Sequence, residues 1–349
     1  MVSRTGVATI RDVAHQAGVS TATVSRVFSG IRSVDHVLAA RVRAAATAVD
    51  YVPNAAGRAL RRQVSDTWAA IVPDVQNPFF TALVAAVESV AVQQGFSVML
   101  CNTNADLDRE QKYLAAAVAQ RMAGIVVAVT SETHSDLGPI VRAGMASVVV
   151  DRRVHDFVSD TVLVDNLLAG RLAATHLLER GYRRPACLVG PADVSTSEDR
   201  LTGFRMALQE AGRPLADERV VRTDLRASAG EAATRVLLDQ TAVPDAVFAA
   251  NGPLTAGAFL AIQGLAPDGV ALIGVDDDQW TRMVSPQVSV IRQPVTEIGR
   301  RAGELLAARS KKPDIPPQHI LLRPQLITRG STTRQVGAAQ GNHSPYRPR

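Results

Sequence analysis

The stretch "VATIRDVAHQAGVSTATVSRVFSG", residues 7–30, places short apolar runs beside small hydroxyl side chains and a single arginine. Its apolar residues recur at helical spacing from Ile10 to Ala17, and Gly18 then interrupts the pattern. Glycine tolerates the left-handed backbone of a tight turn. Ser20 is a favourable N-cap for a second helix, because its hydroxyl can accept hydrogen bonds from free backbone N–H groups. The stretch therefore predicts two short helices joined by a tight turn.

The second of these helices has two chemically different faces. At about 100° per residue, its small or cationic side chains fall on one face: Thr21, Ala22, Ser25 and Arg26. The other face carries Thr23, Val24, Val27 and Phe28. Short side chains allow close approach to base edges in the major groove, where an arginine can donate two hydrogen bonds to guanine. Three hydroxyl side chains are better placed for phosphate oxygens, which set register: Thr9, Ser20 and Thr23. The pattern predicts a DNA-binding helix-turn-helix.

A third helix is predicted from an apolar stripe made of Val34, Leu38, Val42, Ala45 and Val49. The segment "YVPNAAGRALRRQ", residues 51–63, comes next. Pro53 ends the preceding helix, and Asn54 can begin a short one that runs to about Leu60. Leu60 stands among Arg58 and two further arginines, which is unusual for a core leucine, although simple packing in a linker is the alternative.

The positive charge of the chain is concentrated at its start. The first 65 residues contain nine arginines and three aspartates, with no lysine or glutamate, whereas the whole chain has a net charge of +5. Such a basic module joined to a nearly neutral body is typical of nucleic-acid-binding proteins, although an arginine-rich solvated face is the alternative.

Composition excludes several other classes of protein. The 349 residues are 46% hydrophobic and only 4% aromatic, so the cores are predicted to consist mostly of aliphatic side chains. Cys101 and Cys187 are far apart in sequence, which argues against a disulfide scaffold or a zinc site and favours the cytoplasm. The sequence contains neither a recognisable signal peptide nor a membrane-spanning apolar run. It also lacks a nucleophile elbow, a phosphate-binding loop, a dinucleotide fingerprint and paired histidines at metal-ligand spacing, so we expect no enzyme, cofactor or metal.

Beyond residue 66, apolar strand-like runs alternate with helix-length segments. The runs cover residues 68–74, 96–102, 124–130, 147–153, 161–166, 185–190, 245–252 and 270–278. The helical segments include residues 79–94, 106–120, 166–180, 196–211 and 254–264. Buried runs separated by helices predict parallel sheets with helices on both faces, and their number predicts two doubly wound lobes. The late segments 288–295, 295–309 and 319–327 are predicted to be shared between the lobes.

Ligands of such sheets bind at the carboxyl ends of the strands. Polar and aromatic residues near these ends form a candidate site: Asn77, Phe79, Phe80, Asp151, Arg152, Arg200, Asn251, Asp276 and Gln293. Carboxylates and amides can engage vicinal hydroxyls, and phenylalanine can stack on a sugar face. Simpler alternatives are that the aspartates cap turns, that Arg200 pairs with a neighbouring Glu198 or Asp199 on the surface, and that a phenylalanine belongs to the core.

The whole chain resembles the lactose-repressor (LacI/GalR-type) family of transcriptional regulators. The motifs that carry this resemblance are "TIRDVAHQAGVSTATVSRVFSG", "YVPNAAGRAL", "VPDVQNPFF", "DRLTGF", "FAANG" and "IGVDDDQW". The resemblance implies an N-terminal helix-turn-helix domain (1–53), a hinge helix and linker (54–65), and a two-lobed effector-binding and dimerisation domain (66–333). It also implies that the body shares the fold of periplasmic sugar-binding proteins. The composition of the remaining residues, 334–349, predicts a disordered tail.

Residue roles follow from the same resemblance. Base reading falls to Thr21, Ala22 and Arg26, and the hinge from Asn54 to Leu60 would wedge Leu60 into the minor groove. Leu225 stands in the effector pocket where many relatives have an aromatic residue, and Gly252 replaces the aspartate that usually follows the asparagine.

We therefore expect a cytoplasmic, dimeric, sequence-specific repressor that binds a pseudo-palindromic operator under the control of a pentose or other sugar. A purine, nucleoside or sugar-phosphate effector, and a ligand-binding protein without DNA function, are the alternatives.

Overall fold

The computed structural model describes residues 8–28, 34–52, 64–155, 157–265 and 269–334. The chain divides into two compact units, Met1–Ser65 and Asp66–Arg349. The predicted hinge residues Asn54, Arg58 and Leu60, and nearly all of the predicted tail, lie outside the described residues.

The first unit contains three helices: α1 (Ile10–Ala17), α2 (Thr21–Phe28) and α3 (His36–Ala48). Gly18 ends α1 in the left-handed conformation, with φ of 62°, and Ser20 Oγ accepts a hydrogen bond from Thr23 N at 3.2 Å. The turn and the cap are therefore those predicted from the sequence. A small core built from Val13, Val24 and Val42, each fully buried, holds the three helices together.

The second unit is built on two six-stranded sheets. The first sheet, in spatial order β11-β5-β4-β3-β1-β2, is entirely parallel. Its strands are β1 (Thr67–Val72), β2 (Ser97–Asn102), β3 (Gly124–Val127), β4 (Ser147–Val150), β5 (Asp160–Val164) and β11 (His319–Leu322). The first lobe is this sheet with its helices.

The second sheet has the order β12-β10-β9-β8-β6-β7, in which only β12 runs antiparallel to its neighbour. Its strands are β6 (Pro185–Val189), β7 (Val220–Arg222), β8 (Ala246–Ala249), β9 (Ala271–Val275), β10 (Ser289–Arg292) and β12 (Gln325–Ile327). The second lobe is this sheet with its helices.

Helices cover both faces of each sheet, as the alternating pattern predicts. In the first lobe, α5 (Pro78–Gln93) and α13 (Val295–Lys311) pack on one face, and α6 (Leu107–Ala119) and α7 (Gly138–Arg142) on the other. In the second lobe, α8 (Asn166–Glu179) and α9 (Ser195–Glu210) pack opposite α10 (Ala227–Leu238) and α11 (Gly252–Leu265). The short α12 (Trp280–Met283) and the 3-10 turns η1 (Asp217–Arg219) and η2 (Gly330–Thr332) complete the second lobe.

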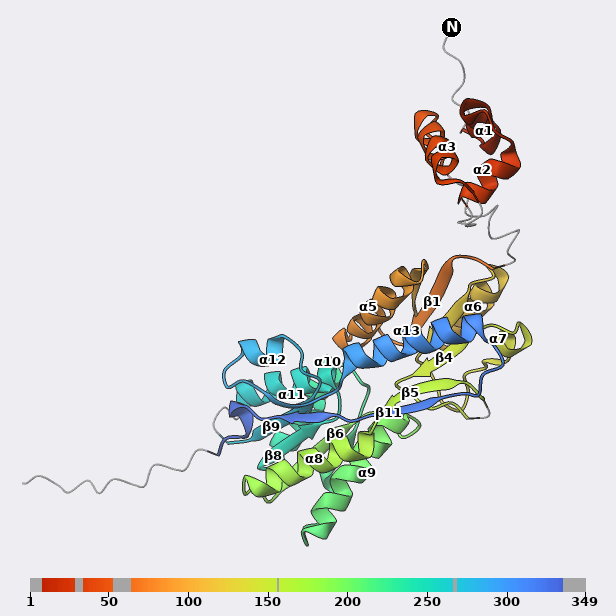
Figure 1. Ribbon diagram of the computed structural model, residues 1–349. Coiled ribbons are helices and arrows are strands. Elements are labelled where there is room, and N and C mark those ends of the chain that lie inside the picture. The colour runs from red at the N-terminus through yellow and green to blue at the C-terminus, as the bar shows by residue number, and fades with distance from the viewer. Residues whose placement is uncertain (1–7, 29–33, 53–63, 156, 266–268, 335–349) are drawn as a thin grey trace, which may run out of the picture. The chain divides into compact units, whose positions relative to one another are not determined.

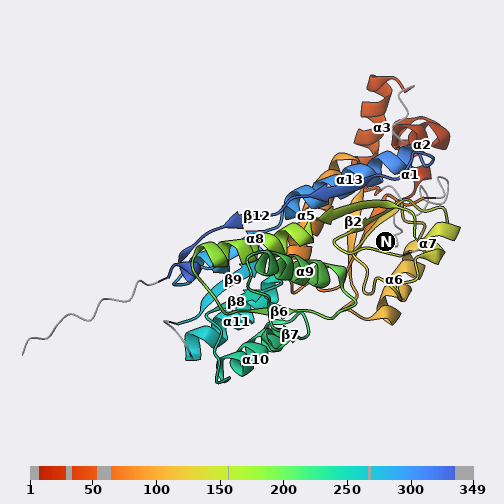
Figure 2. The ribbon, with the colours of Figure 1, turned by 90° about the horizontal axis from the view of Figure 1, so that it is seen from below.

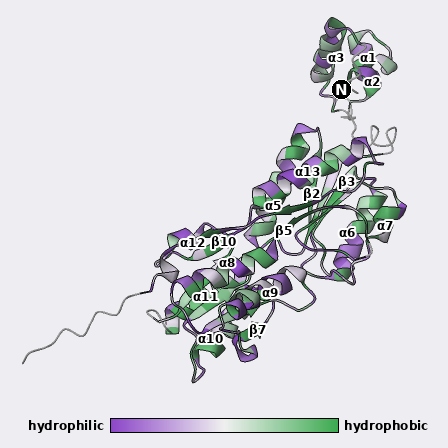
Figure 3. Ribbon diagram, turned by 60° about the horizontal axis from the view of Figure 1, so that its bottom comes forward, coloured by the Kyte–Doolittle hydropathy of each residue, from purple (hydrophilic) through white to green (hydrophobic). Residues whose placement is uncertain are grey.

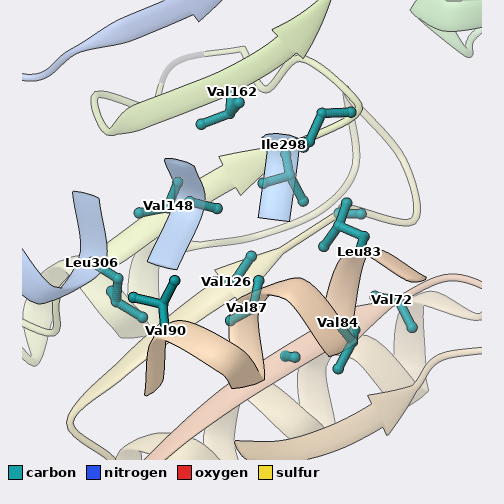
Figure 4. Packing of buried hydrophobic residues seen from close by; sticks show 14 of the residues in the cluster. Val72, Leu83, Val84, Val87, Val90, Val126, Val148, Val162, Ile298 and Leu306 are labelled. Atoms are coloured by element: carbon teal, nitrogen blue, oxygen red, sulfur yellow. The ribbon is translucent and has the colours of Figure 1, made fainter. Parts of the chain in front are cut away.

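The apolar cores are layers between sheet and helices. Figure 4 shows Val126, Val148 and Val162 of the first sheet facing Val87 of α5 and Ile298 of α13. Hydrophobic and hydrophilic residues alternate along the covering helices (Figure 3), as expected of helices that pack one face against a sheet.

Three chain connections join the lobes. They follow β5, follow β10, and run between β11 and β12. The sequence segments 288–295, 295–309 and 319–327 are therefore shared between lobes as predicted, and the last of them is two strands in different sheets. Among the residues that the structure describes, no helix has the length and hydropathy needed to cross a membrane.

Helices α8 and α9 cross at a pair of glycines. A Cβ atom on Gly170 would lie 1.9 Å from the carbonyl oxygen of Arg200, and one on Gly203 would lie 2.0 Å from that of Leu167. Neither carbonyl oxygen can move away from an added Cβ atom unless its helix backbone moves, so the two positions require glycine. Gly264 in α11 has no atom within 4 Å of an added Cβ.

We predict that Gly203→Ala lowers the free energy of unfolding by about 1–3 kcal/mol or more, because the methyl group forces α8 and α9 apart. The matched control Gly264→Ala should be neutral or stabilising by up to about 1 kcal/mol, through helix propensity alone. Thermal and urea unfolding of both variants checks this, and equal stability of the two would contradict the close crossing.

Candidate functional site

The exposed face of α2 is the one predicted to read DNA. Thr21, Ala22 and Arg26 are exposed, and Ser25 is half-buried, whereas Val24 and Val27 are buried against α1 and α3. The three base-reading candidates thus share one accessible helix surface.

Two of the hydroxyl side chains predicted to contact phosphate also cap helices. The Thr9 hydroxyl donates to Asp12 Oδ2 at 2.7 Å, and the Thr9 backbone N–H donates to the same oxygen at 2.7 Å. These bonds lower the pKa of Asp12 and close the N-terminus of α1. Ser20 Oγ lies 3.0 Å from Thr23 Oγ1 as well as capping α2. All three hydroxyl groups remain on accessible or half-buried residues.

The second unit contains a cavity of about 420 Å³ whose walls come from both lobes. All ten predicted ligand-binding residues line it: Asn77, Phe79, Phe80, Asp151, Arg152, Arg200, Leu225, Asn251, Asp276 and Gln293. Most of them arrive there because parallel strands present their carboxyl ends, and the loops that follow, on a common side. Arg200 comes from within α9 (Ser195–Glu210).

Two aspartates occupy equivalent positions in the two lobes. Asp151 follows β4 and Asp276 follows β9, and each is the third strand of its sheet in spatial order. Both take left-handed backbone conformations, with φ of 66° and 74°. Each backbone N–H donates to the next strand, to Val162 O at 3.3 Å and Ile291 O at 3.0 Å respectively. This geometry ends each strand and turns the carboxylate toward the cavity; left-handed non-glycine residues of this kind gather at binding sites.

Both carboxylates are buried, and burial raises their pKa. For Asp276 the pKa rises to about 6, since desolvation outweighs the attraction of Arg200 and the hydrogen bond from Gln293. For Asp151 the positive charges of Arg152 and Arg200 oppose the rise.

Arg200 lies in α9 and is 4% exposed. Its Nε donates to Asn166 Oδ1 at 2.8 Å, and its Nη1 donates to the carbonyl oxygen of Ala250 at 2.5 Å. Burial lowers the pKa of Arg200, and the nearby Asp276 and Asp151 carboxylates counteract this. The proposed alternative, a surface pair with Glu198 or Asp199, is wrong, because those carboxylates pair with Arg222 and Arg153.

The other cationic side chain is held by backbone carbonyls. Arg152 Nη1 donates to Val129 O at 2.9 Å and to Thr130 O at 2.7 Å. Its Nε is buried without a hydrogen-bond partner among the described residues and lies 3.8 Å from Asp151 Oδ2.

The amide side chains are also fixed in orientation. Gln293 Nε2 donates to Asp276 Oδ1 at 2.8 Å, while Gln293 Oε1 is buried and accepts no hydrogen bond from the described residues. Asn251 Oδ1 accepts from Leu254 N at 2.7 Å, and its Nδ2 donates to Leu225 O at 3.2 Å. Asn251 therefore shapes the wall, and Gln293 presents an unused acceptor.

The aromatic wall belongs to both the core and the cavity. Phe79 and Phe80 begin α5, after the N-cap Asn77, whose Oδ1 accepts from Phe79 N at 3.1 Å. The rings contact edge to face at 5.1 Å and pack into the first-lobe core.

Several polar residues of the cavity were missed by the sequence analysis: Asp74, Asn104, Thr130, Asp193, Thr196, Ser197, Asp224 and Arg226. Asp74 and Thr130 are the last residues of the predicted apolar runs 68–74 and 124–130. Because ligands bind at the carboxyl ends of parallel strands, the sequence did contain a signal for these two residues. Thr196 and Ser197 belong to the first turn of α9, whose placement depends on packing against α8. In the described part of the chain, no three acidic, histidine or cysteine side chains gather as a metal site would require.

Comparison with known proteins decides the family. Residues 9–54 match the model of bacterial regulatory proteins of the lacI family, and residues 174–332 match the periplasmic binding protein-like domain. The ribose operon repressor of Escherichia coli (strain K12) is 34% identical over 329 residues, covering 93% of this chain and 99% of the relative. The chain belongs to the lacI family.

Two solved structures support the same assignment at the level of the fold. A lacI-family regulator from Enterococcus faecium with bound ribose is 26% identical, with a TM-score of 0.70, and covers 77% of this chain and 99% of its own. The lac repressor dimer bound to operator and the anti-inducer ONPF is 24% identical, with a TM-score of 0.83, and covers 95% of this chain and 100% of its own.

This lacI-family protein is thus a DNA-binding transcriptional repressor with an effector-binding domain, and not an enzyme. The predicted fold class, a helix-turn-helix followed by two parallel α/β lobes like those of periplasmic binding proteins, is confirmed. The roles of individual site residues stay predictions.

The raised pKa of Asp276 predicts a pH-dependent cost of folding. Its ordinary pKa is 3.8 and its folded pKa about 6. The free energy of unfolding therefore includes the full contribution of protonated Asp276 below pH ~4. That contribution is lost as the pH rises through about 6.

We predict that Asp276→Asn stabilises the ligand-free protein at pH 7.5 by at most about 3 kcal/mol, and so raises its melting temperature. At pH 4 the substitution should change the melting temperature little. Asparagine removes the buried charge and keeps an acceptor for Gln293. The control Asp224→Asn, at an exposed cavity residue, should change stability by less than about 0.5 kcal/mol at both pH values. Thermal unfolding measures both, and a destabilised Asp276→Asn at pH 7.5 would contradict the assignment.

Proposed function

We propose that this lacI-family repressor binds a neutral sugar, of pentose size, in the cavity between its lobes, and that the sugar controls its affinity for an operator. The observation that carries the proposal is a cavity lined by carboxylate, amide, guanidinium and aromatic side chains, two of which have a buried atom with no hydrogen-bond partner among the described residues. Gln293 Oε1 lacks a donor and Arg152 Nε lacks an acceptor among the described residues, and the Asp151 and Asp276 carboxylates line the same cavity.

Sugar hydroxyl groups meet both needs, since each can donate and accept at once. Adjacent hydroxyls would bridge a carboxylate and a guanidinium, and the apolar face of the ring would lie on Phe79 or Phe80. A cavity of about 420 Å³ falls in the usual range for small-ligand sites, roughly 300–1,000 Å³. The ribose named in the descriptions of two relatives supports the pentose class.

The charge of the cavity argues against a phosphorylated effector. Its lining includes five aspartates and three arginines, and two of those aspartates are buried beside Arg200. A phosphate dianion would add negative charge to carboxylates whose burial already opposes ionisation. Purines and nucleosides remain the alternative effectors, and the same binding screen includes them.

We further propose that the repressor acts as a homodimer on a pseudo-palindromic operator. A two-fold dimer matches two half-sites one helical turn or more apart. The lac repressor, which shares this fold, is described as a dimer on its operator. In the proposed domain organisation, residues 1–53 read DNA, 54–65 link, and 66–333 bind effector and dimerise.

A sugar that favours one angle between the lobes would change the operator affinity of the dimer. Linkage requires that operator binding then changes the affinity for the sugar by the same factor. The free energy of coupling between two such sites is typically about 1–3 kcal/mol. Operator binding measured with and without sugar decides whether the sugar induces or corepresses.

Ligand binding is tested by thermal shift of the purified repressor against pentoses, hexoses, sugar phosphates, nucleosides and purines. We expect a pentose at a hundredfold excess over its dissociation constant to stabilise the protein by about 2.7 kcal/mol. Asp276→Ala should abolish the shift, while Asp224→Asn should retain most of it. A shift with a purine or a sugar phosphate and none with any sugar would refute the sugar effector.

DNA reading is tested at Arg26. We predict that Arg26→Ala costs about 1–3 kcal/mol of operator affinity and relaxes specificity at one base pair, because a bidentate contact to guanine is lost. Electrophoretic mobility assays on a library of single-base operator variants measure this. Exposed Arg43 in α3 provides the control, since its replacement by alanine should weaken binding to all sequences alike or not at all. An Arg26→Ala protein with unchanged base preference would show that Arg26 contacts only phosphate.

A further inference from the structure

The N-terminus of α9 is capped from the opposite lobe. Its own N-cap residue is Val194, whose side chain has no acceptor. Glu132, which follows β3 in the first lobe, places Oε1 2.8 Å from the backbone N of Ser195, the first residue of α9. Glu132 is only 6% exposed. A carboxylate at a helix N-terminus satisfies a free N–H group and interacts favourably with the helix dipole.

A second contact joins the same helix turn to the first lobe. Arg153, in the loop after β4, forms an ion pair with Asp199 of α9. The Asp199 side chain is 20% exposed and that of Arg153 is 51% exposed. Two first-lobe side chains therefore hold the first turn and a half of α9, and we name Glu132, Arg153, Ser195 and Asp199 the α9 clasp.

The clasp alternates along the chain with residues of the cavity. Arg153 follows Arg152, and Asp199 precedes Arg200, while Thr196 and Ser197 lie between the two clasp residues of α9. None of the four clasp residues lines the cavity as the structure describes it. The clasp thus links the Arg152 and Arg200 sides of the site through residues that do not line the cavity.

We propose that Glu132 and Arg153 are positioning residues for effector binding: they hold the two lobes at the spacing the effector needs, without touching it. This rests on the proposed effector site between the lobes. A ligand that needs both walls binds with its intrinsic affinity only in the fraction of molecules whose lobes have that spacing. Loss of the clasp lowers that fraction and weakens the apparent affinity by the same factor.

The ion pair offers a charge exchange as its test. We compare the parent, Arg153→Asp, Asp199→Arg and the double exchange in the full-length protein, titrating each with D-ribose by calorimetry. Each single exchange places like charges together and should weaken ribose binding roughly tenfold. The double exchange restores an opposite pair and should return the affinity to within about threefold of the parent. General damage to folding would not be reversed by the second substitution.

A matched control lies within one lobe. Arg171 of α8 and Glu210 of α9 form a bidentate ion pair, with both bonds at 2.8 Å, that does not cross between lobes. Arg171→Glu should leave ribose affinity unchanged even if it lowers stability slightly. Glu132→Ala should weaken ribose binding, and Glu132→Gln, which keeps an acceptor for Ser195 N, should weaken it less.

Lobe spacing is measured separately without any ligand. Dyes on cysteines introduced by Lys112→Cys in α6 and Val236→Cys in α10, both exposed positions, report the distance between lobes by energy transfer; the native Cys101 and Cys187 are buried. The single exchanges should change the energy transfer, and the double exchange should restore it. Unchanged transfer in Arg153→Asp and Glu132→Ala would overturn the clasp. If ribose binds neither the parent nor any variant, the proposed ribose effector is refuted. The energy transfer then still shows whether the clasp sets the distance between the lobes.

Discussion

The structure of the effector domain depends on one constraint, the parallel direction of its strands. Parallel strands release their loops at a common edge, so residues from 74 to 293, separated by more than two hundred positions, meet in one cavity. The same constraint requires a crossover helix between strands, which places helices on both faces and buries the sheets in apolar layers. The three connections between lobes then bring β11, which comes late in the chain, into the same sheet as β1, while β12 joins the other sheet.

Within the cavity, the dominant problem is burial of charge. Arg200 is held by Asn166 and Ala250, and two carboxylates with raised pKa lie near it. A buried ion cluster of this kind is costly unless every lone pair and N–H group is matched. Here Gln293 Oε1 and Arg152 Nε are not matched by described residues. The ligand-free site is thus kept less stable than an apolar core would be, and in the proposed function a polyhydroxylated ligand would offset part of this cost.

The two lobes use the same backbone device with different side chains. A left-handed aspartate ends the third strand of each sheet, but the residues around the two carboxylates differ, Arg152 on one side and Gln293 on the other. Gly252 adds to this asymmetry. A Cβ atom there would lie 3.2 Å from Asp276 Oδ2 and 3.0 Å from Asp278 Oδ2, so both carboxylates pack closely against a position that has no side chain. Because residue 252 is glycine and not aspartate, it adds no negative charge beside Asp276.

The sequence by itself determined the elements and their order. Helical periodicity around Gly18 and Ser20 defined the helix-turn-helix, since local spacing and capping decide where short helices begin and end. Apolar runs located most strands, and the expectation that ligands bind at the carboxyl ends of parallel strands gave eight of the ten predicted cavity residues. Arg200 was added from a helix start, and Leu225 came from the family resemblance. β7, α7 and α12 were not predicted, since they have only 3, 5 and 4 residues, and the 12-residue α10 was not predicted either. Only the tertiary structure decided which acceptors in the cavity lack partners, that Arg200 turns inward instead of pairing with its neighbours, and that Glu132 caps α9 across the lobes. Those outcomes depend on distances between residues far apart in the chain, which no local pattern encodes.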